Sequence, residues 1–588
     1  NKDAAPVLLD SLSKIEYKGY DSVGIATLNN KINLKKGDGK TDVVFENELK
    51  NSEKIVIDDL KGSCGIAHIR WATHGLPNKI NTHPHTDKDR KIAVVQNGII
   101  ENYLEIKEEL INEGYSFISE TDTEILPYLI SKYMNKGLDL ESALRETVNM
   151  IEGNYSIVVI SDDEKKIVAV RKTASLIAGI GEDGYFISSD TAAILDYAQD
   201  IIYPEDEEIL ILTEDGIVIK DKYDKIVDYK TEHIDWSPEL AQKEGYDYFM
   251  LKEINDQSLA MKNALVNEDD IKKIVDDLNG EINRICFVAC GTSYHASLTA
   301  KYLIENLSGI PTEVIVASEF KYSINTLDDK SLVIFISQSG ETADTISAID
   351  ALGGKSKTLS IVNVVGSSMS RKTDYVIYAQ AGPEIAIAAT KSYICQLTAV
   401  YLFAALLSGN DKLLNNLKKV PDYIDDVLTQ AENIKEVSKK YKYADDFFFI
   451  GRGYSYPIAL EGALKLKEVT YIHAEGYAAG ELKHGPLALI DYNVPIVTIL
   501  PPGKDHNKTM ANLEEVKSRG ADVLAIGSKT DSSLKVANDV FYVNPEVDEI
   551  LAPLVYIIPL QLLSYYIAVE KNLDPDSPRN LTKSVTVE

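Results

Sequence analysis

The chain has 588 residues, which corresponds to roughly three or four domains. Its formal net charge is −30, and Lys and Arg form no block that stands out against it. A diffuse acidic surface repels nucleic-acid phosphates and anionic lipid, so we expect neither nucleic acid nor membrane as a partner. An anionic substrate would need a local site built from dipoles and a few cations.

The four cysteines are Cys64, Cys286, Cys290 and Cys395. Cys286 and Cys290 could begin a metal-binding pattern, but no second Cys or His pair follows at ligand spacing. We therefore expect no metal site and reduced thiols in a cytoplasmic protein. No signal peptide is recognisable. The longest apolar run, 551–569, contains two prolines and is expected to be a buried helix rather than a membrane span.

Residues 1–230 are predicted to form a strand-rich α+β domain. Short β-branched runs are separated by Gly, Asn and Asp turns, and helical patterns lie at 103–113 and 122–134. An antiparallel sandwich with flanking helices fits this order better than a βαβ series. The predicted strands are VGIATL, KIAVVQNGII, YSIVVIS, KIVAVRK, EILILT and GIVIK.

The second half has a different order of predicted strands and helices. Residues 231–275 resemble a linker that leads into helices, and from about residue 283 apolar strands alternate with helices, as in a parallel α/β sheet. The pattern then repeats at a displacement of roughly 160 positions, which indicates duplication. We expect two similar α/β domains, 276–425 and 426–575, followed by a tail, 576–588.

The segment LVIFISQSGETADT carries the best ligand-binding pattern. A strand ends in Ser337, Gln338 and Ser339, and Thr342 starts a helix. Strand ends of parallel sheets open onto ligand crevices, and a helix N-terminus attracts anions. Such a loop can hold a phosphate dianion without Lys or Arg. A capping box that uses Ser and Glu341 is the alternative, but it accounts for only two of these polar side chains.

Two further features of the second half point to the same crevice. GTSYHA also follows a strand and opens a helix, so Thr292 and Ser293 either face the ligand or cap the helix. Glu461, Lys465 and Glu468 share one helix face at i, i+4 and i+7. An exposed salt bridge is the usual meaning of that spacing, but the repeat places this face at a strand end, where Glu468 could move a proton between adjacent carbons.

Lys483 and His484 lie among glycines in an otherwise apolar stretch, GYAAGELKHGPLALI. His484 could act as an acid or base near neutral pH. The final residues, DPDSPRNLTKSVTVE, have the composition of a disordered tail. Lys583, however, sits among small residues and could form a Schiff base with a ketone if it were desolvated, although spacing alone does not decide this.

The first half contains a set of residues suited to a free amino acid. Arg70 can bind an α-carboxylate in bidentate fashion, and Asp122 can bind an α-ammonium group. Asn97 and the N–H of Gly98 could form an oxyanion hole. This combination is typical of acyl transfer from an amino-acid side chain.

No nucleophile is evident in this half. Cys64 lies in a predicted strand with no base beside it. His74, His83 and His85 could be bases, ligands or structural residues, and each alone is more often structural.

These motifs resemble the glucosamine-6-phosphate synthase family, the isomerising glutamine–fructose-6-phosphate aminotransferases, over essentially the whole chain. EYKGYDSVGIA, HIRWATHG, QNGIIENY and SETDTE resemble the class II glutamine amidotransferase domain, an N-terminal nucleophile hydrolase sandwich with αββα layers. A second set of motifs resembles the two sugar isomerase domains and the C-terminal tail of the family: ACGTSYHA, ISQSGETADT, EGALKLKE, AAGELKHGPLALI and PRNLTKSVTVE.

The resemblance implies conversion of fructose 6-phosphate and glutamine to glucosamine 6-phosphate and glutamate, the first step of hexosamine biosynthesis. It implies a cytoplasmic homodimer without a metal or organic cofactor. His484 would open the sugar ring, Lys583 would form the Schiff base at C2, and Glu468 would move the proton between C1 and C2, assisted by Lys465. Asn97 and Gly98 would stabilise the oxyanion, and Trp71 would gate the passage of ammonia. Glutamine would be held by Arg70, Thr73, His83 and Asp122, and the sugar phosphate by Thr292, Ser293, Ser337, Gln338, Ser339, Thr342 and Glu384.

Two departures from the family pattern matter. The family's nucleophile is a cysteine in a Cys-Gly-Ile-Val stretch whose free α-amine acts as the base, and by motif alignment this sequence begins roughly eight residues past it. We expect a missing segment, because the rest of the glutamine site is intact. In the loop GPEIAIAATKSY, Ala389 replaces a pocket hydroxyl, which removes one expected substrate contact.

Two other functions stay open. One is an amidotransferase of the same class with a different acceptor, against which the duplicated sugar domain and Lys583 argue. The other is a catalytically silent sugar-phosphate sensor, against which the presence of Glu468, His484 and Lys583 argues. Assays for glucosamine 6-phosphate and glutamate separate these possibilities.

Overall fold

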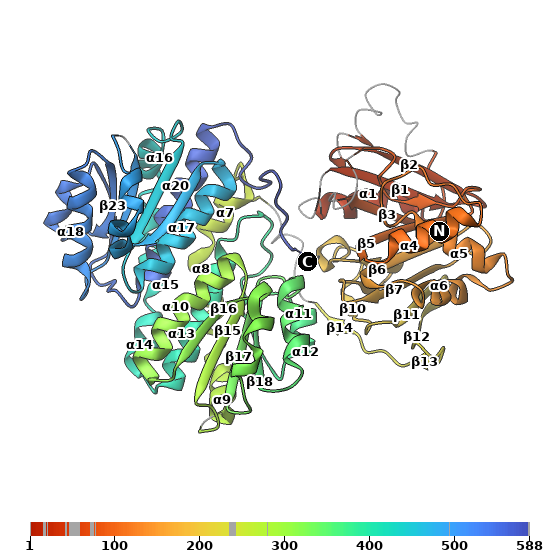
Figure 1. Cartoon of the computed structure of the whole chain (residues 1–588), viewed down its shortest axis with the longest axis horizontal. Coiled ribbons are helices and arrows are strands. Elements are labelled where there is room, and N and C mark those ends of the chain that lie inside the picture. The colour runs from red at the N-terminus through yellow and green to blue at the C-terminus, as the bar shows by residue number, and fades with distance from the viewer. Residues whose placement is uncertain are drawn as a thin grey trace. The chain divides into compact units, whose positions relative to one another are not determined.

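The computed structural model describes residues 2–15, 19, 21–41, 44–45, 59–70, 76, 78–234, 243–278, 280–492 and 494–585. The chain divides into two compact units (Figure 1), one formed by residues 1–238 with 584–588 and the other by residues 239–583.

The first unit is a layered sandwich of antiparallel sheets. Helices α4–α6 cover one face of a seven-stranded sheet, through a core that includes Leu126 and Ile157. The other face packs against a three-stranded sheet, and α1 covers the outer side of that sheet. The order of layers is therefore αββα, as the resemblance implied.

The strands of this unit run antiparallel wherever they pair. The three-stranded sheet has the order β2-β1-β3, the seven-stranded sheet β13-β12-β11-β7-β6-β5-β4, and a four-stranded sheet β14-β10-β8-β9. The helices are α1 (Ala4–Lys14), α4 (Tyr103–Asn112), α5 (Ile125–Met134), α6 (Leu140–Val148) and η2 (Thr191–Ala193). The strands are β1 (Ser22–Leu28), β2 (Ile32–Asp38), β3 (Cys64–Arg70), β4 (His85–Thr86), β5 (Ile92–Ile100), β6 (Gly153–Ser161), β7 (Ile167–Lys172), β8 (Ile177–Gly181), β9 (Gly184–Ser188), β10 (Asp200–Ile202), β11 (Ile209–Thr213), β12 (Gly216–Lys220), β13 (Ile226–Val227) and β14 (Glu232–His233).

All six strands predicted from β-branched runs are confirmed. The helix predicted at 122–134 begins only at Ile125, because the preceding residues form a turn in which Asp122 accepts the N–H of Ile100. Helices α1 and α6 were not predicted. Both are short amphipathic helices whose apolar side chains are few and separated by polar residues.

The second unit contains two five-stranded parallel sheets with the same strand order. The first is β16-β15-β17-β18-β19 and the second is β21-β20-β22-β23-β24. The predicted duplication is therefore visible in the topology. The strands are β15 (Arg284–Ala289), β16 (Thr312–Val316), β17 (Ser331–Ser337), β18 (Lys357–Val362), β19 (Tyr375–Tyr378), β20 (Asp446–Gly451), β21 (His473–Ala478), β22 (Pro495–Leu500), β23 (Asp522–Ser528) and β24 (Asp539–Val543).

The helices connect and cover these sheets. They are α7 (Phe249–Asn255), α8 (Gln257–Leu265), α9 (Glu268–Leu278), α10 (Gly291–Ser308), α11 (Ala343–Leu352), α12 (Ser368–Lys372), α13 (Lys391–Leu407), α14 (Asp411–Leu417), α15 (Val420–Leu428), α16 (Ala431–Ser438), α17 (Ser455–Thr470), α18 (His506–Lys517), α19 (Ala552–Val555) and α20 (Ile558–Glu570). Short 3₁₀ turns are η4 (Ala317–Tyr322), η5 (Ile324–Thr326), η6 (Ala479–His484), η7 (Pro486–Leu489) and η8 (Ser532–Val536).

One strand of this unit was not predicted. The stretch HAEGYA forms β21, an edge strand that pairs with β20. An edge strand is partly exposed and needs no apolar alternation, so the sequence carries little strand signal there. The alternation of strands and helices predicts that SEFKYSI, which follows the strand TEVIVA, is a helix; this prediction is wrong, because the segment lies in the 3₁₀ turns η4 and η5.

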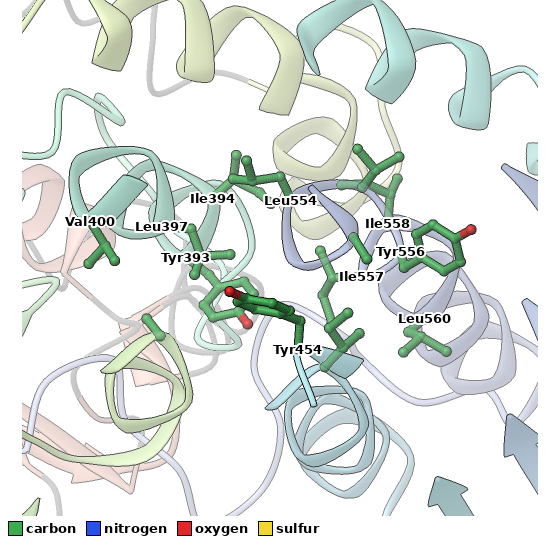
Figure 2. Packing of buried hydrophobic residues seen from close by; sticks show 14 of the residues in the cluster. Tyr393, Ile394, Leu397, Val400, Tyr454, Leu554, Tyr556, Ile557, Ile558 and Leu560 are labelled. Atoms are coloured by element: carbon green, nitrogen blue, oxygen red, sulfur yellow. The ribbon is translucent and has the colours of Figure 1, made fainter. Parts of the chain in front are cut away.

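One hydrophobic core joins the two sheets of the second unit. Figure 2 shows Leu397 and neighbouring side chains of α13 facing Tyr454 at the start of α17 and Ile557 between α19 and α20. The same cluster contains Phe287 of β15 and Phe449 of β20, so it reaches both sheets. Residues of both repeats are therefore held on one packed scaffold.

The long apolar run of the sequence contributes to this core. The segment Ala552–Glu570 is long and apolar enough to cross a bilayer, and 94% of its most apolar window is buried inside the protein. Pro553 and Pro559 each lie in the first turn of a helix, where a missing N–H costs nothing.

Candidate active sites

The predicted phosphate loop follows β17 in the second unit. Ser337 is the last residue of the strand, and its Oγ accepts the N–H of Gly340 at 3.1 Å and lies 2.9 Å from Oγ1 of Thr342. Gly340 has a φ of +66°, and a Cβ there would meet Oγ of Ser367 at 2.2 Å. The loop is thus a tight turn that leads directly to the N-terminus of α11.

The capping-box alternative does not describe this loop. Thr342 is the N-cap residue of α11 and makes no side-chain cap hydrogen bond. Both oxygens of Glu341 instead accept hydrogen bonds from the backbone N–H and the hydroxyl of Ser368. The positive end of the α11 dipole and the hydroxyls of this loop, with Gln338 and Ser339 only partly buried, form a setting that favours an anion.

Thr292 of α10 is tied to α17 rather than to its own helix. Its hydroxyl donates to Glu461 at 3.0 Å and accepts from Nζ of Lys465 at 3.2 Å. Ser293 lies buried in the first turn of α10 beside it. The N-cap residue of α10 is Cys290, which makes no side-chain cap bond, so hydroxyl capping does not explain this motif.

The charged face of α17 is buried, contrary to the usual meaning of its spacing. The side chains of Glu461 and Lys465 are 0% exposed, and Nζ of Lys465 lies 2.5 Å from Glu468 and 3.5 Å from Glu461. His295 of α10 contacts the second oxygen of Glu461 at 2.7 Å. A chain of polar contacts therefore connects the two repeats below the crevice.

Burial and charge act in opposite directions on this face. Burial disfavours the ammonium of Lys465, but the carboxylates of Glu468 and Glu461 outweigh it and raise the pKa of Lys465. Burial raises the pKa of Glu468 by more than the neighbouring Lys465 lowers it. Glu468 consequently holds a proton more readily than a surface glutamate does, which suits a group that accepts and returns protons.

Lys583 is buried, with only 5% of its side chain exposed. Its Nζ donates to Oε2 of Glu384 at 2.5 Å and to the carbonyl oxygen of Ala386 at 2.7 Å. This environment is the desolvated setting that a Schiff-base lysine requires.

Glu384 organises the loop that receives Lys583. Its Oε1 accepts the N–H groups of Thr390 and Ser392 at the start of α13, and its Oε2 accepts the Ser392 hydroxyl at 2.6 Å. Burial alone would raise the pKa of Glu384, but Lys583 and Ser392 lower it to about 2. Glu384 was expected to line the sugar pocket, and in the structure it binds the lysine itself.

The tail before Lys583 is fixed at two points, although its composition suggested disorder. The Asp576 carboxylate accepts the N–H groups of Phe249 and Met250 at 2.8 Å, which caps α7. The N–H of Arg579 donates to the Tyr471 hydroxyl at 2.7 Å, and its guanidinium lies 4.3 Å from the centre of that ring.

His484 does not join this cluster within the chain. It ends η6, is exposed, and takes no part in the hydrogen bonds or ion pairs that connect Lys583, Glu384 and α17 in the described part of the structure. The expected apolar setting is wrong, because Lys483 is also exposed and pairs with Glu515. The flanking glycines form surface turns rather than a buried loop.

In the first unit, Arg70 and Asp122 come together as the sequence suggested. Arg70 is the last residue of β3 and is 4% exposed. Burial lowers its pKa, and the negative charges of Asp21 and Asp122 oppose that shift. Asp122 accepts the N–H of Ile100 at 2.9 Å, which places it beside the end of β5.

Asn97 and Gly98 lie on β5 near a row of buried histidines. Nε2 of His68 lies 2.9 Å from Oδ1 of Asn97, and because that oxygen can only accept, the histidine nitrogen donates. The ring of His83 lies between those of His68 and His85, tilted against the first at a centroid distance of 4.4 Å and edge-on to the second at 5.0 Å. Burial lowers the pKa of His68 to about 4 and lowers that of His83 well below its ordinary value, so these rings are neutral and weakly basic.

Gly98 is required by the backbone at this point. Its φ is +102°, and a Cβ would lie 2.0 Å from the carbonyl oxygen of Asn154. Trp71 and Thr73, expected at the ammonia passage and the glutamine site, and His74 lie outside the described residues. Cys64 begins β3 as predicted, and burial raises the pKa of its thiol to about 11, so it is not an activated nucleophile.

Some residues at these sites were not predicted. His68 orients Asn97, His295 pairs with Glu461, and Glu253 of α7 accepts N–H groups from the Lys583 loop. The first lies in a motif that had been noticed, but which neighbour it orients depends on strand pairing. The described residues contain no group of three His, Cys, Asp or Glu side chains placed to hold a metal.

Comparisons with known proteins identify the family of both halves of the chain. The glutamine amidotransferase domain family matches residues 69–196, and the SIS domain family matches residues 281–406 and 441–571. The isomerising glutamine–fructose-6-phosphate aminotransferase of Methanothermobacter thermautotrophicus is 54% identical over 587 residues, which span 100% of this chain and 98% of that protein. The protein of the same name from Thermococcus kodakarensis is 45% identical over 100% of this chain and 98% of its own length.

The chain belongs to the isomerising glutamine–fructose-6-phosphate aminotransferase family. Among solved structures, the C-terminal domain of glucosamine-fructose-6-phosphate aminotransferase from Francisella tularensis is 38% identical. It has a TM-score of 0.54 and covers 57% of this chain and 100% of that domain. Tagatose-6-phosphate ketose/aldose isomerase from Escherichia coli, 17% identical with a TM-score of 0.52, shares the fold of the second unit.

The contact between Glu384 and Lys583 predicts that the stability of this member of the aminotransferase family depends on pH. The pKa of Glu384 is lowered from 4.5 to about 2, so its ionised form stabilises the fold fully above pH 4.5 and that stabilisation is lost as the pH falls toward 2. A pKa shift of this size corresponds to a contribution of about 3 kcal/mol to the free energy of unfolding. Glu384→Gln should lower the free energy of unfolding by that order at pH 7, and the difference from wild type should narrow between pH 4.5 and 3.

Urea titrations followed by circular dichroism measure this difference. Glu319→Gln, at an exposed glutamate of η4, is the control for loss of one charge. If the free energy of unfolding of Glu384→Gln stayed below that of wild type by the same amount at every pH, the lowered pKa of Glu384 would be contradicted.

Proposed function

We propose that this chain carries out the reaction for which its family is named. It takes ammonia from glutamine, transfers it to fructose 6-phosphate and isomerises the product to glucosamine 6-phosphate. The observation that carries the proposal is the buried Lys583 amine, held by Glu384 and Ala386 within a unit that also contains the hydroxyl loop after β17 and the charged face of α17.

The sugar phosphate would bind at the loop of Ser337, Gln338, Ser339 and Thr342. The helix dipole of α11 and several hydroxyl donors can hold a dianion without a cationic side chain. This arrangement suits a chain with a net charge of −30. The overall charge does not attract a phosphate, so the attraction must come from the helix dipole and hydroxyls of the loop, which act at close range. Thr292 and Ser293 would contribute at the neighbouring strand end.

Lys583 would then attack the C2 ketone of the open sugar. A C–N bond forms, the carbonyl oxygen leaves as water, and the lysine nitrogen gives up two hydrogens to become an imine. Ammonia adds to the same carbon and displaces the lysine, which regains its amine. An ammonium at Lys583 must first lose one proton, because only the neutral amine has the lone pair that attacks the carbonyl.

Glu468 would move a proton from C1 to C2 of the resulting imine, which converts a ketose derivative into an aldose with an amino group at C2. Its raised pKa suits a group that must both accept and return that proton. Lys465, 2.5 Å away, would hold the carboxylate in place and balance its charge.

The first unit would supply ammonia. Arg70 would bind the glutamine carboxylate and Asp122 its ammonium group, while Asn97 and Gly98 would stabilise the oxyanion formed on the amide carbon. The neutral His68 ring supports this role, because its donation to Oδ1 of Asn97 leaves the amide nitrogen to donate elsewhere. His83 would contribute to the shape of the glutamine site.

We assign the domains as 1–230, 276–425 and 426–575 with a linking segment and a catalytic tail, and we propose a cytoplasmic homodimer. The four cysteines are all free thiols, which fits a reducing compartment. His484 is exposed in the single chain, and a second copy is the simplest means of bringing it to a sugar as the acid or base that opens the ring.

The isomerase half can be tested with ammonia in place of glutamine. Lys583→Ala should abolish glucosamine 6-phosphate formation, by at least about 10³-fold, because the nucleophile is removed. Wild type treated with fructose 6-phosphate and borohydride should carry a reduced sugar adduct at Lys583, detectable by mass spectrometry. Glu468→Gln should still form this adduct but turn over slowly. Normal synthesis by the Lys583→Ala variant would exclude an imine mechanism.

The glutamine site can be tested by binding alone. Arg70→Lys should weaken glutamine binding by about tenfold or more, since lysine cannot make the bidentate contact and charged hydrogen bonds contribute roughly 1.5–3 kcal/mol. Isothermal titration calorimetry measures the affinity. Arg145→Lys is the control, because Arg145 contacts Asp221 and Asp224 at the surface. Equal affinities in the two variants would argue against a role of Arg70.

The role of two copies can be tested by mixing inactive variants. Lys583→Ala and His484→Ala homodimers should each lack activity. After the subunits exchange, mixed dimers should recover up to about half of the sites if His484 acts across the dimer, because one site then contains both native residues. Absence of recovery in confirmed mixed dimers would mean that both residues act within one chain.

A further inference from the structure

The carbonyl that receives Lys583 belongs to an irregular segment, residues 384–387, between β19 and α13. Lys583 has two acceptors, the Glu384 side chain and the main-chain oxygen of Ala386. A loop carbonyl can fix an amine only if the loop itself is held. What holds this segment therefore determines where the amine lies.

Glu253, near the end of α7, holds it from the opposite side. Its Oε1 accepts the N–H of Ile385 at 2.5 Å and the N–H of Ala386 at 3.3 Å. The two peptide groups whose N–H groups Glu253 binds therefore directly precede the peptide group whose carbonyl binds Lys583. Glu253 is only 2% exposed, so this contact is not shared with bulk water.

The helix that carries Glu253 is anchored on the tail that carries Lys583. Asp576 caps α7 through the N–H groups of Phe249 and Met250, and its own carbonyl accepts the N–H of Ile387 at 3.0 Å. Tail, helix and loop therefore form a closed ring of hydrogen bonds. A displacement of Glu253 would move both contacts of the Lys583 amine.

The charge on Glu253 is also unusual. Burial and the neighbouring Glu384 raise its pKa to about 8, while Lys583 and Lys391 oppose this. Its Oε2 has no hydrogen-bond partner among the described residues. A carboxyl used only to brace two N–H groups needs neither a free oxygen nor a place beside a reactive ammonium.

We propose that Glu253 is a positioning residue for imine formation: by binding the N–H groups of Ile385 and Ala386 it fixes the loop whose next carbonyl holds the Lys583 amine, and its carboxyl contributes to the charge around that amine. This inference rests on the proposed function of Lys583. It assigns Glu253 to the condensation step and not to the binding of the sugar phosphate, because among the described residues Glu253 hydrogen-bonds to the loop that holds the lysine and to no residue of the phosphate loop.

The chemical reason is geometric. The amine must reach C2 along a narrow direction as the C–N bond forms and water leaves, and displacement by about 1 Å can reduce the rate by about 100-fold. Glu253→Ala removes the acceptor of two N–H groups and frees the loop. Glu253→Gln keeps an oxygen acceptor at the same reach but cannot ionise.

The experiment measures the rate at which fructose 6-phosphate and borohydride label Lys583, by mass spectrometry of the intact chain and of the tail peptide. Affinity for glucitol 6-phosphate, which has the phosphate but no carbonyl, is measured in parallel by calorimetry. Glu253→Ala should slow labelling about tenfold or more, with less than about threefold change in glucitol 6-phosphate affinity. Glu253→Gln should label within about threefold of wild type at pH 7.

The pH dependence separates positioning by charge from simple bracing. Above pH 8 wild-type Glu253 gains a negative charge, which favours the ammonium form of the nearby lysine, so labelling should rise less steeply than in Glu253→Gln. The groups that face Glu253 are Glu384, Lys583 and Lys391, and they are unchanged in that variant. Identical profiles for the two proteins would overturn the contribution of charge.

Asn255→Ala is the matched control. Asn255 lies on the same helix, is partly buried and, among the described residues, donates its side-chain hydrogen bond to Leu251 of its own helix, so this variant should label like wild type. If Glu253→Ala does not fold, Glu253→Asp keeps the carboxyl group but shortens the reach by one methylene and should also slow labelling.

Labelling of Glu253→Ala or Glu253→Asp at the wild-type rate would overturn the proposal, as would equal loss of labelling and glucitol 6-phosphate affinity. Absence of label on wild-type Lys583 would instead overturn the proposed function from which the inference starts.

Discussion

A buried ammonium needs a counter-charge, and this requirement organises the sugar-converting unit. Lys583 is nearly inaccessible to solvent, and Glu384 provides the opposite charge at 2.5 Å. Removal of either partner would leave a charge in the protein interior, which is far more costly than the pair is stabilising. The tail, the 384–392 loop and the start of α13 are therefore obliged to come together.

Glu384 meets this requirement while also satisfying the N-terminus of α13. The same carboxylate accepts N–H groups at the start of that helix and the ammonium from the tail. Helix α13 is almost fully buried in the core that joins the two sheets. The position of the reactive amine is thus coupled to the packing of the whole unit, and the site is assembled only when the unit is folded.

The duplicated fold is used asymmetrically. The two sheets have the same strand order, yet the first repeat contributes the hydroxyl loop after β17 and the second contributes the charged face of α17. Thr292 and His295 connect the two through Glu461 and Lys465. In both units of this acidic chain, anionic groups would be recognised locally, by a helix dipole and hydroxyls in one and by a buried Arg70 in the other. Local recognition of this kind needs no positive surface.

The sequence by itself determined the fold class and the duplication, and it nominated the residues of the candidate sites. Periodic strands such as those ending at Ser337 and Arg70 are local patterns, and turn residues with hydroxyls at strand ends have a direct physical meaning. The strands β5–β7 and the parallel sheets follow from β-branched runs whose side chains must be buried. The family resemblance added the roles of Lys583 and Glu468, which spacing alone left undecided.

The tertiary structure decided what depends on contacts between distant segments. Glu253 and Lys583 are 330 positions apart in the sequence, and nothing near either residue indicates that both bind the same loop. The burial of the α17 face, the exposure of His484 and the edge strand β21 likewise depend on which element packs where. Sequence periodicity reports what one segment prefers, whereas a buried charge, a shared carbonyl or a partner for an edge strand is fixed only when segments remote in the chain meet.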